Sequence, residues 1–283
     1  MVMPTVLLAM PALSFVTTCK GRLEHLRQTL PRLAAQPDSE CIVVDYDCPD
    51  GTADWVQANF PAVRIVRVPH APLFHKPHAQ NLGAALATAP WLCLIDADIL
   101  VDDAFAACLL PMLKEGHYLR PDPIDLGAYG SFVCARSDFE AAEGYDETFE
   151  GCSYMDDDLY VRLDMAGVRT AGFPGDYFVA IRHDHDLRTR HYAIKDRALN
   201  HRINFLYANI KHDLMRQSLG ENLPLESRRA IYAEVRRVLL AQAASGTTSA
   251  KLEVNLPMFS SVPERFGWKI HRRWTFDLTQ SGP

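Results

Sequence analysis

The stretch that most constrains the fold of this chain is residues 91–100, W-L-C-L-I-D-A-D-I-L. An apolar run from Trp91 to Ile95 ends at two acids, Asp96 and Asp98. A short continuous apolar run predicts a strand that is buried on both faces, as in a parallel sheet. If the chain stays extended, the two carboxylates point the same way, because side chains alternate along a strand.

Two carboxylates at the end of a buried strand are costly to leave unpaired, so this pair favours a cation. A hard divalent ion suits few carboxylates when phosphate oxygens fill its remaining positions. In the alternative interpretation, Asp96 and Asp98 only begin a loop and a following helix, where Asp102 and Asp103 are equally acidic. The stretch alone leaves both interpretations open.

Composition narrows the class of protein. A chain of 283 residues with 48% hydrophobic residues is long enough to bury a large α/β core. The net charge of -6 and the lack of a Lys/Arg run argue against a nucleic-acid partner. No apolar stretch reaches the roughly 20 residues of a membrane span, and residues 2–16 are broken by Pro4 and Pro11 and lack the basic start of a signal peptide.

The cysteines indicate a reducing compartment. They are odd in number and scattered, without a C-x-x-C pair: Cys19, Cys41, Cys48, Cys93, Cys108, Cys134 and Cys152. Such a set is typical of reduced, mostly buried thiols. We therefore expect a cytoplasmic protein without a membrane span, and peripheral contact of the tail with a membrane surface stays open.

Strand-like and helix-like patterns alternate over the first hundred residues. Strands are expected over residues 13–17, 41–47, 64–68 and 91–95, and helices over residues 23–33, 55–60 and 79–89. This alternation predicts a parallel sheet with right-handed crossovers. Ligands of such sheets bind beyond the carboxyl ends of the strands, which here carry Thr18, Asp45, Asp47, Asp96 and Asp98. Neither G-x-G-x-x-G nor G-x-x-x-x-G-K-[ST] occurs, so the usual dinucleotide and P-loop sites are not indicated.

The second half predicts a helix over residues 102–113, a strand over 127–135 and an S-x-x-E capping box over 137–140. Asp156, Asp157 and Asp158 then precede an apolar helical pattern, and negative charge is favoured in the first turn of a helix. Capping explains one or two of these acids. Since adjacent like charges repel, at least one of the three has another role.

A further strand, over residues 177–182, leads to His183 and His185. Their alternate spacing puts both imidazoles on one strand face, which suits metal binding, although a single histidine is more often structural. The basic passage over residues 188–195 is either a solvated loop or a phosphate clamp. Residues 203–244 predict helices, and the tail from Ser245 is first polar and then aromatic.

Several motifs together resemble the inverting glycosyltransferases of the GT-A fold. In the front half, T-T-C-K-G-R at residues 17–22, V-V-D at 43–45 and D-A-D at 96–98 are similar to family 2. In the back half, residues 151–163 resemble the G-W-G-G-E-D-D-D-[LI]-Y-x-R-L motif of the β-1,4-galactosyltransferases. Residues 74–83 resemble their F-N-R-A-K-x-x-N-x-G motif, and residues 180–183 their M-I-R-H. The resemblance extends from residue 13 to about residue 205.

This resemblance implies a GT-A fold, an α/β architecture with a Rossmann-like, mostly parallel sheet flanked by helices. The catalytic domain would span residues 1–205, with a nucleotide-binding half over 1–100 and an acceptor and catalytic half over 101–205. Residues 206–283 would form a helical C-terminal extension and tail.

The resemblance also assigns roles to single residues. The donor, a UDP-sugar, is expected to contact Thr17, Thr18, Arg22, Asp45, Phe74, Lys76, Asn81 and Asp96. We further predict that residues 188–195, with Arg188 and Lys195, form a mobile lid over the diphosphate, since closure would exclude water that hydrolyses the donor. Asp98 and His183 are expected to bind Mn²⁺ or Mg²⁺, with Asp96 and His185 as further ligands. Asp156 matches the general base, and Asp157 lies beside it.

The sequence departs from these motifs at three places. Ala180 replaces a methionine metal ligand, Cys152 replaces the tryptophan that stacks on the acceptor, and Met155 replaces the glutamate beside the base. The acceptor preference of the galactosyltransferases is therefore not transferred to this chain.

The sequence thus predicts a metal-dependent inverting glycosyltransferase of polysaccharide biosynthesis. It would move a hexose or N-acetylhexosamine from a UDP-sugar to a glycan or a lipid-linked saccharide. One alternative is a catalytically degenerate module that only binds nucleotide sugars, as the three departures suggest. A sugar nucleotidyltransferase is less favoured, because residues 18–22 hold one glycine where that chemistry uses a glycine-rich basic loop.

Overall fold

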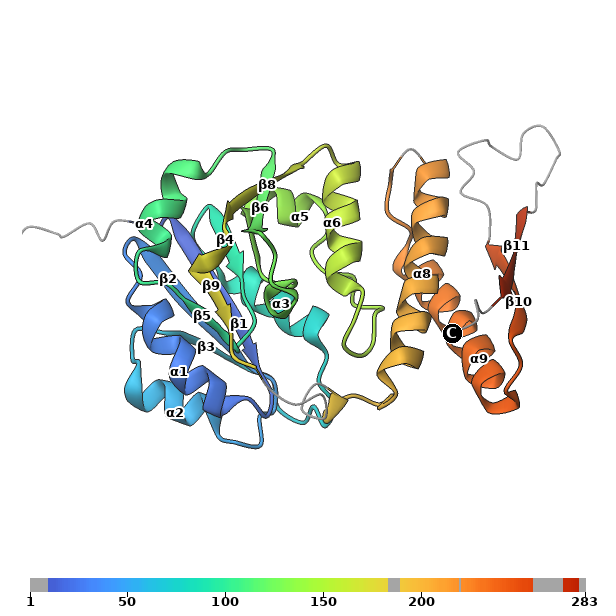
Figure 1. The fold of residues 1–283 in the computed structure, drawn as a ribbon, viewed down its shortest axis with the longest axis horizontal. Helices are drawn as coiled ribbons and strands as arrows, with labels where there is room; N and C mark the ends of the chain where they lie inside the picture. The colour runs from blue at the N-terminus through green and yellow to red at the C-terminus, as the bar shows by residue number, and fades with distance from the viewer. Residues whose placement is uncertain (1–9, 183–188, 219, 257–271, 280–283) are drawn as a thin grey trace, which may run out of the picture. The chain divides into compact units, whose positions relative to one another are not determined.

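The computed structural model of the chain describes residues 10–182, 189–218, 220–256 and 272–279 (Figure 1). Contacts divide the chain into two compact units. Unit 1 comprises Met1–Glu147 and Leu159–Ala193, and unit 2 comprises Thr148–Asp158 and Ile194–Pro283. This division differs from the boundary expected after residue 205, and the independence of the predicted domains stays a prediction.

Unit 1 is built on a seven-stranded sheet with the order β3-β2-β1-β4-β7-β6-β8. Its strands are β1 (Leu13–Cys19), β2 (Ser39–Asp45), β3 (Arg64–Arg67), β4 (Trp91–Leu94), β6 (His117–Asp122), β7 (Phe132–Ala135) and β8 (Arg169–Pro174). The first four strands are parallel, β7 is antiparallel to β4 and to β6, and β8 is parallel to β6. The predicted α/β class with a mostly parallel sheet is confirmed.

Helices cover both faces of this sheet (Figure 1). On one face, α1 (Leu23–Ala34), α2 (Thr52–Asn59) and α4 (Phe105–Leu109) share one apolar cluster with Phe15 and Val43. On the other face lies α3 (Lys76–Leu86), where a Cβ at Gly83 would overlap Val16. Neighbouring residues of β1 thus face opposite layers, which explains why every position of this strand is buried.

The chain reverses its direction of winding between β1 and β4. From β1 it continues to β2 and β3 on one side, and β4 then pairs with the other edge of β1. Ligands of open α/β sheets bind at such a switch point, beyond the carboxyl ends of the strands. Cys19, Asp45 and Leu94 mark this edge in β1, β2 and β4.

Beyond β4 the chain does not stay extended. Strand β4 ends at Leu94, residues 97 and 98 form a turn, and the Ile99 N–H donates to the Asp96 carbonyl at 3.2 Å. The expectation that both carboxylates share one face of an extended strand is therefore wrong. The chain then enters β5 (Ile99–Val101), which pairs in antiparallel fashion with β9 (Phe178–Ala180) in a separate two-stranded sheet.

Some predicted boundaries differ from the observed ones. The capping box is wrong, because α5 (Arg136–Ala141) begins before Ser137 and has Ala135 at its N-cap without a side-chain cap. The strand expected over residues 127–135 is only β7, preceded by the 3-10 turn η2 (Leu126–Ala128). The helix expected over 102–113 is α4 followed by η1 (Leu110–Met112), and η3 (Gly175–Tyr177) precedes β9.

Unit 2 contains two long helices, α8 (Arg197–Gln217) and α9 (Leu225–Ser245). They pack through aromatic rings, with the centroids of Tyr207 and Tyr232 5.3 Å apart. The hairpin partners β10 (Ser249–Leu256) and β11 (Arg272–Thr279) follow, so the tail is not wholly helical. Within the described ranges, none of the helices combines the length and the apolar character needed to cross a membrane.

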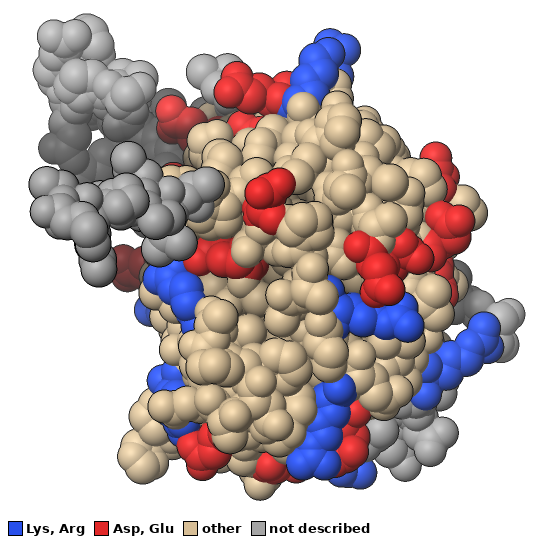
Figure 2. Space-filling model, turned by 90° about the vertical axis from the view of Figure 1, so that its left-hand side faces the viewer, with Lys and Arg blue, Asp and Glu red and all other residues tan. Residues whose placement is uncertain are grey.

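Charges of both signs lie close together on the face of the molecule drawn in Figure 2. Basic and acidic side chains alternate there over a largely uncharged surface. This pattern agrees with the modest net charge of -6. The expected lack of a nucleic-acid partner stays a prediction.

Candidate functional site

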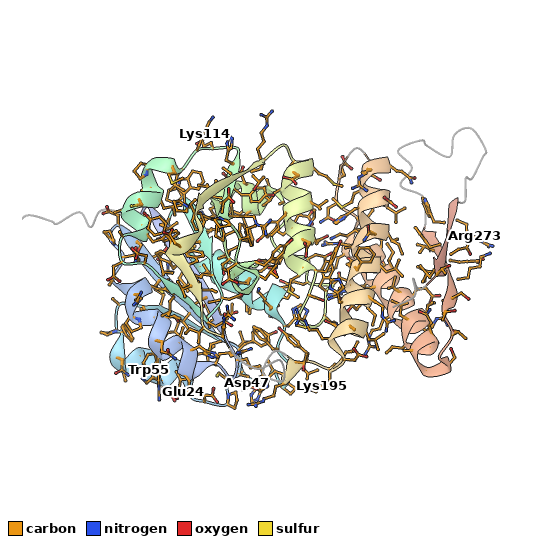
Figure 3. All side chains as sticks on the ribbon, in the orientation of Figure 1. Glu24, Asp47, Trp55, Lys114, Lys195 and Arg273 are labelled. Atoms are coloured by element: carbon orange, nitrogen blue, oxygen red, sulfur yellow. The ribbon has the colours of Figure 1, made fainter. Side chains whose placement is uncertain are left out.

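Lys20 fixes the loops at the carboxyl edge of the sheet. Its side chain is 3% exposed and its Nζ donates to the carbonyls of Tyr46 (3.1 Å), Asp47 (2.8 Å) and Ala71 (2.6 Å). The Asp47 carboxylate lies 3.9 Å from the same ammonium (Figure 3). Because buried ammonium groups need such partners, Lys20 holds residues 18–22 against the loop after β2.

The predicted donor residues of β1 differ in access to solvent. Thr17 is fully buried within the sheet, Thr18 is 6% exposed near the edge, and Arg22 is half-buried at the N-cap of α1. Asp45 is also buried, and its two oxygens accept the N–H groups of Cys48 and Ala53, each at 2.7 Å. Asp45 therefore organises the turn into α2, and its predicted contact with uridine stays a prediction.

Two predicted donor residues meet at the switch point. Lys76 at the start of α3 pairs with Asp96 in the loop after β4, with Nζ and Oδ1 2.9 Å apart. Their side chains are 12% and 28% exposed, so neither is sealed in the interior. The negative charge of Asp96 is therefore paired with the ammonium of Lys76.

Part of the predicted lid contacts these elements within unit 1. The Phe74 N–H donates to the His191 carbonyl at 2.8 Å, and the rings of Phe74 and Tyr192 are 5.8 Å apart. Gly21 has a φ of +67°, and a Cβ there would overlap the His191 imidazole. Residues 189–193 thus pack on the loop predicted to bind the donor. Arg188 lies outside the described residues, Lys195 is exposed in unit 2, and the mobility of the lid stays a prediction.

The predicted metal ligands are only partly described. Asp98 is half-buried, and its carbonyl accepts the Ile181 N–H at 2.8 Å. His183 and His185 lie outside the described residues. In the remainder of the chain, no three His, Cys, Asp or Glu side chains are grouped closely enough to hold an ion. A carboxylate with an imidazole suits Mn²⁺, so the predicted ligand set is chemically reasonable for that ion.

The Ala180 departure has a steric explanation. Ala180 pairs with Ile99 across β5 and β9, and its Cβ lies against Gly127, where an added Cβ would be 2.5 Å away. The small side chain lets the 3-10 turn before β7 pack on β9.

Asn81 has a local structural role. Its amide Nδ2 donates to the Tyr145 carbonyl and the Glu147 carboxylate, both at 2.9 Å, and its Oδ1 accepts the Tyr145 N–H at 2.8 Å. The expected contact of Asn81 with the nucleotide stays a prediction.

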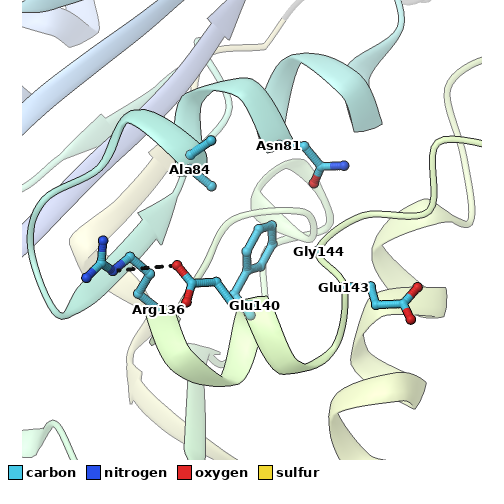
Figure 4. Close-up of a pocket in the computed structure, with 8 residues that line it drawn as sticks. Asn81, Ala84, Arg136, Glu140, Glu143 and Gly144 are labelled. Atoms are coloured by element: carbon cyan, nitrogen blue, oxygen red, sulfur yellow. Dashed lines mark ion pairs between the residues drawn. The ribbon is translucent and has the colours of Figure 1, made fainter. Parts of the chain in front are cut away.

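Asn81 also lines a pocket of about 340 Å³ between α3 and α5 (Figure 4). Its other lining residues are Ala84, Ala85, Arg136, Phe139, Glu140, Glu143 and Gly144. Ala84 lies eight residues along α3 from Lys76, which is about 12 Å at 1.5 Å per residue. The pocket thus lies toward the opposite edge of the sheet, and we do not assign it to the donor.

The three acids at the start of α6 (Met155–Met165) have different surroundings. Asp158 is fully buried and pairs with Lys211 Nζ at 2.5 Å and His212 Nε2 at 2.8 Å. Asp156 and Asp157 are half-buried. The repulsion between adjacent acids predicted that at least one of the three has a role besides capping. For Asp158 this role is a buried ion pair in unit 2. The catalytic roles of Asp156 and Asp157 stay predictions.

An aromatic cluster precedes these acids in unit 2. Tyr154 has a φ of +69° and packs edge-on against Phe205 (5.3 Å) and His201 (5.6 Å) of α8. Phe205 is 45% exposed, and burial together with the Asp157 charge raises the pKa of Tyr154. Sequence reasoning missed this cluster, because nothing in the spacing relates residue 154 to residues 201 and 205.

The loop before α6 is held by two asparagines of α8. Asn200 Oδ1 accepts the Cys152 N–H at 3.0 Å, and Asn204 Nδ2 donates to the Ser153 carbonyl at 2.7 Å. Gly151 has a φ of +88°, and a Cβ there would overlap the Asn200 amide. Glycine is therefore required at the position where the galactosyltransferase-like motif begins.

The sheet order, its switch point and the acidic loop after β4 define the GT-A class of α/β folds. A mannosyltransferase of Pyrobaculum calidifontis, solved with GDP-mannose and Mn²⁺, is similar with a TM-score of 0.53 and 16% identity over 85% of this chain and 77% of that one. TarS of S. aureus, solved as residues 1–349 with UDP-GlcNAc, is similar with a TM-score of 0.56 and 12% identity. The match covers 79% of this chain and 72% of that one. These likenesses confirm the fold.

A family profile matches part of the chain. Residues 14–120 match the profile of Glycosyl transferase family 2. The resemblance of this stretch to family 2 glycosyltransferases is therefore confirmed, and the galactosyltransferase likeness of the back half stays a prediction. No curated protein sequence matches the chain.

Proposed function

We propose that this protein is a metal-dependent inverting glycosyltransferase that moves a hexose or N-acetylhexosamine from a UDP-sugar to a glycan or lipid-linked saccharide. The observation that carries the proposal is the solvent-accessible pair of Lys76 and Asp96 at the β1–β4 switch point. An ammonium there offers hydrogen bonds to the diphosphate or the base, and a carboxylate accepts them from ribose hydroxyls. The nucleotide sugars named for the two structural neighbours support a donor of this class.

Asp98 and His183 are the residues that we propose to hold Mn²⁺ or Mg²⁺. Asp98 lies beside Ile181, because its carbonyl accepts the Ile181 N–H, and His183 follows Ile181 by two residues in the sequence. This nearness along the chain supports a shared ion. When bound, the ion supplies Lewis-acid stabilisation of the negative charge on the departing diphosphate.

Asp156 is proposed as the general base. The acceptor oxygen bonds to the anomeric carbon, the bond from that carbon to the diphosphate oxygen breaks, and UDP leaves with the electron pair. The hydroxyl proton passes to the carboxylate of Asp156. A single displacement inverts the anomeric centre, so the reaction requires no covalent nucleophile. The start of α6 stabilises negative charge there.

The acceptor is proposed to contact the aromatic cluster of Tyr154, His201 and Phe205. The apolar C–H faces of a pyranose ring pack well on exposed aromatic faces, and the rings of His201 and Phe205 lie 18° from parallel. Tyr154 is two residues from Asp156, and its left-handed backbone conformation is of the strained kind that occurs at functional sites. A saccharide held on these rings would present a hydroxyl beside the base.

The test is a screen of UDP-sugars and GDP-mannose with Mn²⁺ and with Mg²⁺, followed by kinetics of Asp156→Asn. We expect this variant to lose about 10²- to 10⁴-fold in the rate of transfer while donor binding is retained. Asp164→Asn, the same change in the same helix, is the control and should keep its rate. An unchanged rate in Asp156→Asn would exclude the base, and UDP binding measured by calorimetry without turnover of any donor would favour the degenerate binding module.

A further inference from the structure

Two thiols meet at the carboxyl edge of unit 1, on chain segments that neighbour the proposed donor loop. Cys19 is the last residue of β1 and is fully buried, whereas Cys48 follows β2 and is partly exposed. Their Sγ atoms are 3.9 Å apart. A disulfide between them would therefore join the end of β1 to the loop that follows β2, its parallel neighbour.

Hydrogen-bond donors converge on the sulfur of Cys48. The Gly21 N–H donates to Sγ at 3.1 Å, and the Thr52 hydroxyl donates at 3.1 Å. The Cys19 Sγ lies 3.2 Å from the Thr52 oxygen, so Cys19, Cys48 and Thr52 each contact the other two. Three donors around one sulfur stabilise a thiolate in the way that a helix N-terminus or a nearby cation does elsewhere.

Several charged groups lie on the segments around this pair. Asp45 accepts the Cys48 N–H, Asp50 accepts the Leu23 N–H at 3.4 Å, and the ammonium of Lys20 lies 3.9 Å from the Asp47 carboxylate. The hydrogen bond from Cys19, opposed by burial and aided by Thr52 and the backbone of Asp50 and Gly21, lowers the pKa of Cys48 to about 6. The same bond and burial raise the pKa of Cys19, so one member is a thiolate and the other a thiol at neutral pH.

We propose that Cys48 and Cys19 are an oxidisable pair, in which Cys48 is the nucleophile toward a peroxide and Cys19 is the thiol that closes a disulfide. The Cys48 sulfur attacks one oxygen of hydrogen peroxide, so that an S–O bond forms, the O–O bond breaks and hydroxide leaves. The Cys19 sulfur then attacks the sulfenic sulfur, an S–S bond forms, and the hydroxyl leaves as water with the Cys19 proton. In total, one thiolate and one thiol are oxidised, and one peroxide is reduced to a water and a hydroxide, which takes up a solvent proton to become the second water.

The disulfide would act on the segment that precedes α1. A bond of about 2.05 Å requires the two sulfurs to approach by nearly 2 Å. That movement removes Sγ of Cys48 from the Gly21 N–H and displaces the loop in which Gly21 contacts His191. Oxidation would thereby alter the loop at residues 18–22, whatever substrate the protein uses.

The first experiment measures alkylation of the full chain by iodoacetamide as a function of pH, with peptide mass spectrometry at each cysteine. We expect the Cys48 rate to rise with a midpoint near pH 6. At pH 6.5, Cys48 should react roughly fivefold faster than the exposed Cys108, since a larger thiolate fraction outweighs its lower intrinsic reactivity. Cys19→Ala should move the Cys48 midpoint upward, whereas Cys93→Ala, a buried thiol of β4, should not. A Cys48 midpoint near that of a free thiol, about 8.5, would overturn the proposal.

The second experiment treats the reduced chain with one equivalent of hydrogen peroxide and maps its peptides without reduction. We expect a linked pair of peptides containing Cys19 and Cys48, lighter by two hydrogens than the separate peptides. In Cys19→Ala, dimedone should instead trap sulfenic acid at Cys48. Linkage of Cys48 to any other cysteine, or oxidation of Cys108 before Cys48, would contradict the assignment. Neither experiment measures transfer activity, so failure of this proposal can be distinguished from failure of the proposed function.

Discussion

Two lysine–aspartate pairs, one in each unit, differ in their surroundings more than in their chemistry. Lys211 and Asp158 in unit 2 are both 0% exposed, 2.5 Å apart, and Lys211 Nζ lies over the rings of Phe149 and Tyr207. Lys76 and Asp96 in unit 1 are 2.9 Å apart and remain in contact with water. The first pair is part of the packed interior, and the second lies where a ligand can reach it.

This difference shows that one ion pair near a predicted active site can stabilise the fold while another remains available to bind a ligand. A buried ion pair is costly to break, because one partner is left charged and without solvent. An accessible pair contributes little to stability and can exchange its partner for a ligand group. Loss of Lys211 should therefore lower the stability of the fold, whereas loss of Lys76 should mainly lower the affinity for the donor.

The largest expected effect is on the stability of unit 2. Lys211→Met removes the ammonium that lies 2.5 Å from the fully buried carboxylate of Asp158, and we expect a loss of about 3–5 kcal/mol in the free energy of unfolding, measured with urea. Adding Asp158→Leu should restore most of that loss. Arg216→Met, which removes an exposed pair with Asp213 on the same helix, should cost less than about 1 kcal/mol. Equal losses from Lys211 and Arg216 would remove the contrast between the pairs.

The next effect is on the donor side of unit 1. We expect Lys76→Met to raise the KM for the nucleotide sugar roughly 10- to 100-fold, because a charge-assisted hydrogen bond contributes about 1.5–3 kcal/mol. The free energy of unfolding should change by less than about 1 kcal/mol. Lys114→Met, an exposed lysine of unit 1, is the control for loss of charge (Figure 3). A destabilisation as large as that of Lys211→Met, with KM unchanged, would assign Lys76 to packing alone.

A third pair, Glu40 with Arg64, has side chains that are 15% and 35% exposed, and it tests the effect of pH. Burial alone would raise the pKa of Glu40, but hydrogen bonds from Ser14, Thr88 and Arg64 lower it to about 2. Because the pKa in the unfolded chain is about 4.3, this carboxylate stabilises the fold above that pH, and the stabilisation is lost as the pH falls toward 2. Glu40→Gln should cost about 1–2 kcal/mol at pH 7, since solvent screens part of the charge. The gap between variant and parent should narrow below pH 4, and a gap that is constant from pH 7 to pH 3 would contradict this account.

The smallest effect concerns the exposed face of unit 2. Phe205→Ala removes one ring from the aromatic cluster, and we expect the KM for the saccharide acceptor to rise about three- to tenfold, as for a contact of about 1 kcal/mol. The KM for the donor should stay the same. Phe205→Tyr keeps a ring and should behave as the parent does. If the donor KM rises equally, the cluster does not distinguish the two substrates.

The front half of the fold could be predicted because its strands are covered on both faces. Strands β2 and β4 contain such apolar runs, and the patterns placed β1, β2, β3 and β4 within two residues of their observed bounds. Strands β6 and β8 were missed for the opposite reason. Strand β6 contains Arg120 and Pro121, and most residues of β8 are exposed at the sheet edge, so neither shows an apolar run.

The edge that carries the candidate site was predictable, but the partners of its residues were not. Parallel strands place Asp45 and Asp96 at one edge whatever their contacts are. That Asp96 meets Lys76 while Asp45 binds backbone N–H groups depends on the turn after Leu94 and on the position of α3. The same holds for Asp158, because only packing on α8 distinguishes it from the two acids before it.

Strand β1 is made first but lies in the middle of the sheet, between β2 and β4. As the chain leaves the ribosome, β1 can pair with β2 early, while its other edge must wait for residues 91–94, more than seventy positions later. Such distant pairing slows folding and leaves an apolar strand edge open in the meantime. Synthesis that stalls before residue 91 should therefore yield nascent chains that bind chaperones more strongly than those released after it.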